Sequence, residues 1–224
     1  MINLDNYLHL KQELVNSNIK LIAVSKNQPN SNIQFLYDIG HRDFGENKAQ
    51  ELTSKHTALP PDIQWHFIGH LQTNKIKSII PFVTLIHSVD SYKLLQEINK
   101  EALKVGRVVD CLLQVYIAKE ESKFGLDEEE LNEIPSSKEF NNLKNINITG
   151  LMGMATFTDD YSLVRKEFRY LNNLFNQIKT EYFKDTSTFK ELSMGMSDDY
   201  KIAIEEGSTM IRVGTYIFSE RVNF

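Results

Sequence analysis

The sequence contains almost none of the residues that cross-link a chain or build a metal cluster. Its 224 residues include one cysteine, Cys111, which excludes an internal disulfide and a cysteine-based metal centre. Cys111 lies in the apolar run VVDCLLQVYI, where we expect a buried structural thiol. The chain also has no Walker P-loop, no GxGxxG fingerprint and no GxSxG elbow, so the motifs of those nucleotide-binding and hydrolase classes are missing.

Long apolar runs and an excess of positive charge are missing as well. No stretch of 18 apolar residues occurs, and the N-terminus MINLDNYLHLKQELVNS lacks the positive start and apolar core of a secretory signal. We therefore expect a soluble, cytoplasmic protein that does not bind a membrane. The net charge of −5 argues against nucleic-acid binding, because neutralising phosphates requires clustered Lys and Arg. Small molecules remain as the expected ligands.

What the sequence does have is enough apolar content for one large core. Hydrophobic residues make up 41% of the chain and no segment has the composition of a linker, so we expect one domain over 1–224. Apolar, β-rich runs alternate with helical patterns along the whole chain. The expected strands are 20–25, 42–45, 64–68, 84–87, 108–117, 146–153, 190–193 and 209–213. The expected helices are 3–17, 31–39, 47–57, 72–80, 91–104, 127–142, 160–180 and 198–206.

This alternation predicts a parallel sheet, because each return crossover needs a helix. Eight strands also close a TIM barrel, so the predicted fold class is α/β, a single TIM (β/α)8 barrel with an extra N-terminal helix. A doubly wound open sheet is the alternative. The barrel is favoured because small and polar residues follow every strand, where a barrel gathers the strand ends into one ring. They are Lys26; Gly45, Glu46 and Asn47; Gly69 and His70; Ser88; Ser122 and Lys123; Gly153, Met154 and Ala155; Ser193 to Ser197; and Gly214 and Thr215.

Lys26 closes the first apolar run, LIAVSK, at its C-terminal end. An unprotonated lysine amine at that place can form a Schiff base with an aldehyde. Most lysines, however, are solvent-exposed and do no chemistry, so Lys26 alone indicates little. Its meaning depends on what lies across the barrel from it.

The segments after strands seven and eight occupy the usual phosphate site of a barrel. LSMGMSDDYKIAI (192–204) offers hydroxyls, a glycine and a helix start that Ser197 or Asp198 would cap, and MIRVGTYIF (210–218) adds an arginine, a glycine and a threonine. Ordinary turn glycines and caps are the alternative interpretation. A lysine across the barrel from a phosphate site suggests a phosphorylated aldehyde, and pyridoxal 5′-phosphate (PLP) is the obvious candidate.

Seven segments, spread from the first strand to the last, carry a resemblance to a known family. They are AVSKNQP (23–29), DFGENKAQE (43–51), WHFIGHLQTNK (65–75), ESKFGL (121–126), GLMGMA (150–155), LSMGMSDD (192–199) and RVGTYIF (212–218). With them the chain resembles the pyridoxal phosphate homeostasis proteins, whose fold matches the barrel domain of bacterial alanine racemase. The resemblance implies a protein that binds PLP, buffers its free level and hands it to PLP-requiring apoenzymes.

The resemblance also implies a role for each matching position. Lys26 would carry PLP as a Schiff base, Asn47 would lie near the ring, and Arg212 would face the pyridine nitrogen. The other implied cofactor-binding residues form the phosphate loops: Ser193, Met194, Gly195, Gly214 and Thr215. Asn27 and Gln28 stand where the family more often has Thr and Lys, which leaves Lys26 itself in place. The final SERVNF departs from the family pattern with no evident effect on the site.

An arginine at the ring nitrogen has a chemical consequence. A guanidinium stays protonated, so it leaves the pyridine neutral and a weak electron sink. Carbanion chemistry then needs a second, well-placed base, which alanine racemase takes from an additional domain and its dimer partner. This sequence ends at Phe224, soon after the eighth strand. We therefore expect a monomeric PLP-binding protein with no catalytic residue. The alternative is a one-domain amino-acid racemase of weak activity, for which Tyr216 and Lys123 are candidates by location only.

Two further positions have competing interpretations. Lys123 is either the charged end of a strand or a second, transient aldehyde acceptor that assists cofactor transfer. His66 and His70 have the i, i+4 spacing of a zinc pair, but they lie on a strand and a turn, and HFIGH lacks the glutamate of HExxH. We expect no metal there. His70 is expected to order the loop after the third strand instead.

Overall fold

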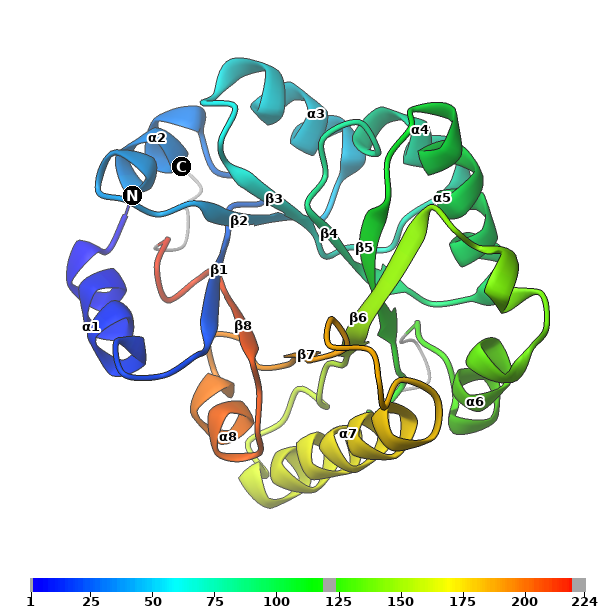
Figure 1. Ribbon diagram of the computed structural model, residues 1–224. Helices are drawn as coiled ribbons and strands as arrows, with labels where there is room; N and C mark the ends of the chain where they lie inside the picture. Colours follow the sequence, from blue (N-terminus) through cyan, green and yellow to red (C-terminus); the bar gives the residue numbers. More distant parts are fainter. Residues whose placement is uncertain (1, 119–123, 219–224) are drawn as a thin grey trace.

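Eight parallel strands form a closed barrel at the centre of the molecule (Figure 1). The computed structural model describes residues 2–118 and 124–218. Each strand pairs with the next along the chain, and β8 pairs with β1 to close the ring. The strands are β1 (Lys20–Val24), β2 (Asp43–Glu46), β3 (Gln64–Phe67), β4 (Leu85–Val89), β5 (Val109–Gln114), β6 (Ile146–Met152), β7 (Glu191–Ser193) and β8 (Met210–Val213). The predicted TIM barrel is thereby confirmed, and the doubly wound alternative is wrong because the sheet closes on itself.

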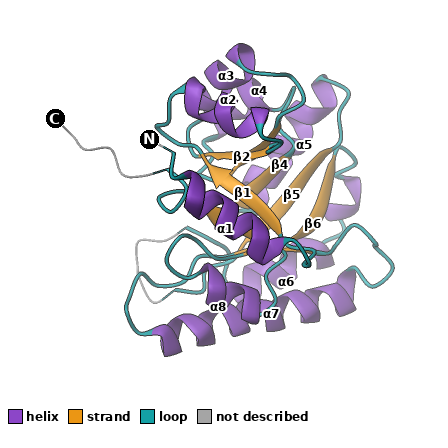
Figure 2. Cartoon of the chain, turned by 90° about the vertical axis from the view of Figure 1, so that its left-hand side faces the viewer, coloured by secondary structure: helices purple, strands orange, loops and turns teal. Residues whose placement is uncertain are grey.

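Helices surround the barrel (Figure 1). They are α1 (Leu4–Leu14), α2 (Asn30–Asp38), α3 (Ala49–Ala58), α4 (Ile76–Ile79), α5 (Tyr92–Lys104), α6 (Glu128–Ser136), α7 (Tyr161–Tyr182) and α8 (Tyr200–Glu205), with short 3₁₀ helices η1 (Thr73–Lys75) and η2 (Phe140–Asn142). The expected N-terminal helix, α1, lies outside β1 and between α2 and α8 (Figures 1 and 2). The Tyr200 hydroxyl donates to Glu13 Oε2 at 2.9 Å and ties α8 to this end of the chain.

The main apolar core lies between the barrel and its helices. In α7 the buried residues Val164, Phe168, Leu171, Phe175 and Ile178 recur every three or four positions, which places them on one face of the helix. Each such side chain stabilises the fold by about 1.5–3 kcal/mol when fully buried. Helix α7 keeps a polar face, and within the described ranges no helix is both long and apolar enough to cross a membrane.

The interior of the barrel is only partly apolar. A small separate cluster consists of Leu85, Leu112, Met152 and Met210. Leu85 and Met210 lie two residues before His87 and Arg212 on their strands, so alternation places each pair on the same face of the sheet. The barrel therefore encloses both apolar and polar side chains.

Two predicted helices differ from the structure in a way that the sequence explains. The expected helix 127–142 is broken, because Pro135 has no backbone N–H and α6 ends one residue after it. The expected helix 198–206 begins later, at Tyr200, and its N-cap is Asp199. The prediction that Ser197 or Asp198 caps this helix is therefore wrong. The Asp199 carboxylate accepts instead from the Met196 N–H at 2.6 Å, which leaves Ser197 available for another contact.

Candidate functional site

Lys26 lies at the carboxyl end of the barrel, directly after a buried residue. The Ser25 N–H donates to Gly45 O of β2 at 2.9 Å and extends the β1 ladder by one residue. The chain then turns, because Asn27 has a φ of 60°, in the left-handed region that residues other than glycine seldom adopt. Ser25 is fully buried, whereas Lys26 is exposed. The lysine is therefore open to a ligand at the mouth of the barrel.

Gly214 brings the end of β8 against β1. A Cβ at this position would lie 3.3 Å from Val24 Cβ and 3.4 Å from Val24 O, so glycine permits the close approach. The N–H groups of Gly214 and Tyr216 both donate to Ser197 Oγ, at 3.3 Å each. These hydrogen bonds are longer than usual. Two backbone donors thus converge on one point beside the β1 end, as a phosphate oxygen would require.

The loop after β7 is held by glycine and by helix α8. Gly195 has a φ of +95°, and a Cβ there would lie 2.6 Å from Ala203 Cβ, so a side chain would push the helix away. Gly195 O accepts from the Arg212 N–H at 2.9 Å, and the Met194 N–H donates to Met210 O at 3.1 Å. Met194 is fully buried. These contacts join the loop to β8, which carries the other predicted phosphate residues.

Arg212 is buried inside the barrel and points at two neutral acceptors. Its Nη1 donates to Ser193 Oγ at 2.6 Å and its Nη2 to Gly153 O at 3.0 Å. No ion pair joins this guanidinium to a carboxylate in the part of the chain that the structure describes. Burial lowers the pKa of Arg212 to about 10, and the charge of Asp199 partly offsets this shift. The guanidinium therefore stays protonated at neutral pH.

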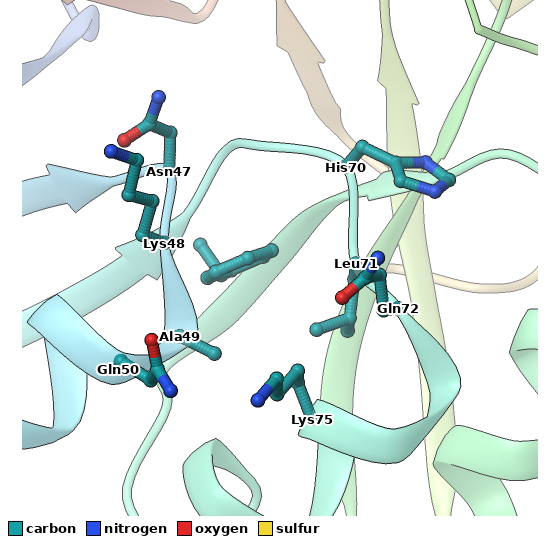
Figure 3. A pocket seen from close by; sticks show the side chains of 9 residues that line it. Asn47, Lys48, Ala49, Gln50, His70, Leu71, Gln72 and Lys75 are labelled. Carbon is teal, nitrogen blue, oxygen red and sulfur yellow. The ribbon is translucent and has the colours of Figure 1, made fainter.

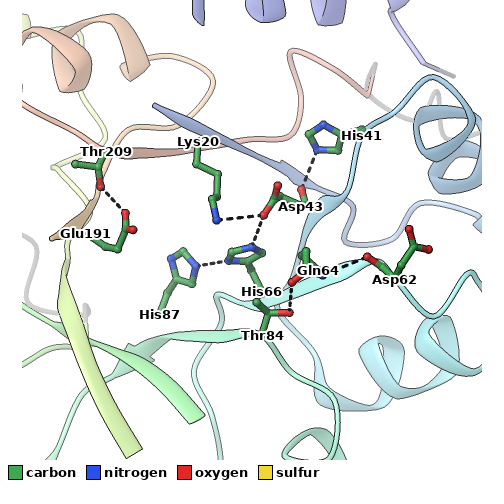
Figure 4. A network of polar contacts seen from close by, with 10 residues as sticks. All are labelled: Lys20, His41, Asp43, Asp62, Gln64, His66, Thr84, His87, Glu191 and Thr209. Atoms are coloured by element: carbon green, nitrogen blue, oxygen red, sulfur yellow. Dashed lines mark hydrogen bonds and ion pairs between the residues drawn. The ribbon is translucent and has the colours of Figure 1, made fainter. Parts of the chain in front are cut away.

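A chain of hydrogen bonds continues from Arg212 across the barrel interior, and Figure 4 shows its part from His87 through His66 to Asp43 and Lys20. Ser193 Oγ lies 2.9 Å from His87 Nδ1, His87 Nε2 lies 2.9 Å from His66 Nδ1, and His66 Nε2 lies 3.0 Å from Asp43 Oδ1. Lys20 Nζ stands 3.5 Å from the same carboxylate oxygen. The chain joins β8, β7, β4, β3 and β2, and because β4 and β7 are not neighbours it must cross the interior.

The donor at one end, Arg212, and the acceptor at the other, Asp43, determine the position of every proton in this chain. Asp43 only accepts, so His66 carries its hydrogen on Nε2, and its Nδ1 then accepts from His87 Nε2. His87 Nδ1 in turn accepts the Ser193 hydroxyl hydrogen, while Ser193 Oγ accepts from Arg212. Both imidazoles are neutral in this arrangement, and burial lowers the pKa of each, most strongly that of His87. Each group in this chain thus donates a hydrogen bond to the next, from Arg212 to Asp43.

Asn47 lies directly after β2, next to the β1 end. A Cβ on Gly69 would lie 2.4 Å from Asn47 O and 2.7 Å from Asn47 Cα, so the glycine lets this loop pack against the asparagine. Asn47 Oδ1 is buried without a hydrogen-bond partner among the described residues. Asn47 also lines a cavity of about 240 Å³, with His70 and Lys75 on other walls (Figure 3). A buried amide oxygen of this kind is suited to a bound ligand.

The remaining candidates from the sequence are His70, Cys111 and Lys123. His70 Nδ1 is 2.9 Å from Asp90 Oδ2, and its ring stacks on Phe124 at 4.2 Å. No group of three or more His, Cys, Asp or Glu side chains could hold a metal within residues 2–118 and 124–218. Cys111 is fully buried, and burial raises the pKa of its thiol. Lys123 lies outside the described residues.

The chain is similar to known proteins over most of its length. Residues 4–222 match the model of the alanine racemase N-terminal domain. A pyridoxal phosphate homeostasis protein from Aquifex aeolicus (strain VF5) is 41% identical over 204 residues, which cover 90% of this chain and 87% of the relative. This chain belongs to the pyridoxal phosphate homeostasis protein family. The family resemblance seen in the seven sequence segments is therefore confirmed.

Solved structures agree with this assignment. PipY, a member of the family from Synechococcus elongatus PCC7942, is 34% identical, and the match covers 96% of this chain and 99% of PipY. The TM-score is 0.88 for PipY without PLP and 0.85 for PipY with PLP bound. An alanine racemase from Clostridium difficile 630 has a TM-score of 0.77 at 16% identity, over 99% of this chain and 58% of the racemase. That second likeness concerns the fold alone.

Sequence reasoning missed two residues that the structure places at the site. Ser197 joins the loops after β7 and β8, although its place in SMGMS two residues beyond a glycine suggested only a helix cap. His87 lies in the middle of the buried strand LIHSV. A histidine at such a position is itself a signal, because a buried imidazole needs hydrogen-bond partners.

Proposed function

We propose that this protein binds PLP at the carboxyl end of its barrel, holds it on Lys26 and thereby buffers the free cofactor. One observation carries the proposal. The ends of β1, β2, β7 and β8 bring together an exposed lysine, an asparagine with a buried, unpartnered oxygen, two converging backbone donors and a buried guanidinium. The names of the relatives and the PLP in PipY support the same cofactor.

The residues present fit the groups of PLP. The Lys26 amine would add to the aldehyde carbon, and a C=N bond would form as water leaves; because water can reverse this step, the attachment can load and release. The N–H groups of Gly214 and Tyr216, with the Ser197 hydroxyl, would hold the phosphate, and the exposed Thr215 hydroxyl lies between them in the chain. Met194 and Gly195 would shape this loop through their backbone.

Ser193 takes a different part in this proposal from the one implied by the resemblance. Its hydroxyl already accepts from Arg212 and lies within hydrogen-bond distance of His87, so both of its polar contacts are used inside the barrel. We expect Ser193 to orient Arg212, and Ser197 to contact the phosphate. In this proposal Ser193 does not contact the phosphate, as the resemblance implies, but acts on the cofactor through Arg212.

Arg212 favours a carrier over an enzyme. A guanidinium with a pKa near 10 can donate to the pyridine nitrogen but cannot give it a proton at neutral pH, so the ring stays a weak electron sink. The expected absence of a catalytic residue stays a prediction, as do monomeric state and delivery to apoenzymes. Tyr216, one of the two racemase candidates, has its ring 6.1 Å from that of Tyr200.

The test is to load the purified protein with PLP and reduce it with borohydride, which fixes a C=N bond. Mass spectrometry should then find the added mass on the peptide that contains Lys26, and Lys26→Ala should carry none. Lys77→Ala, at an exposed lysine on α4, is the matched control and should load like the wild type. A wild-type protein that cannot be loaded, or that carries the adduct elsewhere, would overturn the proposal. Racemisation of alanine well above that of Lys26→Ala would favour the enzyme.

A further inference from the structure

A buried ammonium lies directly behind the Lys26 turn. Lys55 belongs to α3 and is 4% exposed. Its Nζ donates to Ser25 O at 2.7 Å, to Glu46 Oε1 at 2.7 Å and to Glu51 Oε1 at 2.6 Å. An ammonium has three hydrogens, and all three are used. None of these groups takes part in the proposed binding of PLP.

The acceptors of Lys55 hold the backbone on both sides of Lys26. Ser25 O belongs to the peptide unit that precedes Lys26, and Lys55 Nζ donates to it. The Asn27 N–H belongs to the peptide unit that follows Lys26, and it donates to Glu51 Oε1 at 2.7 Å. The two dihedral angles of Lys26 lie between these two fixed peptide units. Together, Lys55 and Glu51 therefore determine the direction in which Lys26 leaves the backbone.

The same cluster supports the unusual turn that follows the lysine. Asn27 has a φ of 60°, and its N–H is bonded to Glu51. The Ser25 hydroxyl donates to Glu46 Oε1 at 2.5 Å, which fixes the residue before the lysine as well. A left-handed residue other than glycine persists only where its surroundings hold it, and such residues concentrate at functional sites.

Stability alone is a poor reason for this cluster. Removing charges from water is costly, and well-packed apolar residues often replace a buried ion pair without loss. In this cluster, hydrogen bonds do not offset the whole cost of desolvation, because Glu46 Oε2 is buried and has no hydrogen-bond partner in the described ranges. Burial accordingly raises the pKa of Glu46, although the charge of Lys55 opposes the shift. The polar groups give the turn a defined geometry that apolar packing would not.

We propose that Lys55 and Glu51 are positioning residues, which hold the backbone of Lys26 so that its amine meets the aldehyde of PLP. This inference rests on the proposed function, since it concerns the same lysine. It predicts that the cluster acts on covalent attachment and not on the phosphate loops, whose contacts come from β7 and β8. Glu46 assists by fixing Ser25 and Lys55.

The experiment is a double-mutant cycle with Glu51→Ala and Lys26→Ala. In the wild-type background, Glu51→Ala should slow the appearance of the borohydride-fixed adduct by about tenfold or more, the effect of losing a hydrogen bond to a charged group. In the Lys26→Ala background, where PLP binds only through non-covalent contacts, Glu51→Ala should change the dissociation constant by less than about twofold. Hydrogen exchange at the Asn27 amide should quicken in Glu51→Ala with or without PLP.

Two controls separate positioning from folding. Glu206→Ala removes another carboxylate, 8% exposed, that bonds Arg165 and Arg169 away from the turn; it should lower the melting temperature without slowing adduct formation. Lys55→Met, of similar length, should slow the adduct like Glu51→Ala. If Glu51→Ala weakens PLP binding equally in both backgrounds, or forms the adduct at the wild-type rate, the inference is wrong. If the wild type forms no adduct on Lys26, the proposed function itself fails.

Discussion

Replacing His87 by leucine tests whether the polar chain through the barrel is continuous. Leucine resembles histidine in size but can neither donate nor accept a hydrogen bond. The change leaves His66 Nδ1 and the Ser193 hydroxyl without their partner, at 1% and 0% exposure. Each buried group left unsatisfied costs about 1–3 kcal/mol, so the two together cost about 2–6 kcal/mol. The gain from burying leucine offsets part of this, and we expect a net loss of more than about 1 kcal/mol.

Urea unfolding of the protein without PLP measures this loss directly. Trp65, the one tryptophan of the sequence, is fully buried beside His66 on β3, and its fluorescence should report the transition. Thr84→Val is the control. Thr84 is half-buried directly before β4, the strand of His87, and its hydroxyl donates to Gln64 Oε1 at a long distance of 3.3 Å. This substitution should cost no more than about 0.5 kcal/mol. A loss below about 1 kcal/mol in His87→Leu would refute the continuous chain.

Two further predictions concern pH and the phosphate loop. The free energy of unfolding should fall as pH drops from 6.5 towards 4. Burial lowers the pKa of four histidines, that of His41 to about 4, so the unfolded chain binds more protons than the folded one. The four are His41, His56, His66 and His87. Each contributes up to about 1.4 kcal/mol per pH unit. The raised pKa values of Glu46 and Asp199 oppose them, and a flat urea-unfolding profile between pH 6.5 and 4.5 would contradict the prediction. Ser197→Ala should weaken PLP binding in equilibrium dialysis by about tenfold, the effect of one hydrogen bond to a charged group, whereas a larger loss in Ser193→Ala would return the phosphate role to that residue.

The fold was predictable because its signals are local. Apolar runs of four to eight residues, separated by helical patterns, identify strands and crossovers without any knowledge of which strands pair. The end of the barrel that carries the site was predictable for the same reason, since small and polar residues follow each strand. Lys26 stood out by its place at the end of the first strand, and the family resemblance supplied the roles expected for Lys26 and Arg212. Helices 127–142 and 198–206 were predicted with the wrong boundaries. Pro135 ends the first one early, and in the second the pattern does not show that Asp199, and not Asp198, is the N-cap.

The detailed contacts of the site were not predictable, because they join residues far apart in the chain. In the sequence, Glu51 and Lys55 form an i, i+4 pair of the type common on exposed helix faces. Only the packing of α3 beside the β1 end buries Lys55, half-buries Glu51 and brings both to the backbone around Lys26. Ser193 and Ser197 are likewise similar in sequence, since the first ends β7 and the second lies four residues further on. One points into the barrel and the other to the β8 loop, and that difference depends on Arg212 and Gly214.

The pairing of β1 with β8 has a consequence for how the protein comes into being. Lys20 pairs with Met210, so the strand that precedes the lysine leaves the ribosome long before its partner strand does. The Asn3 N–H donates to Ile217 O at 2.8 Å, which repeats the same long-range closure at the N-terminal segment. A nascent chain therefore carries Lys26 long before it has Arg212 or Gly214 beside it. The proposed PLP site is therefore complete only after β8 has been made and has paired with β1.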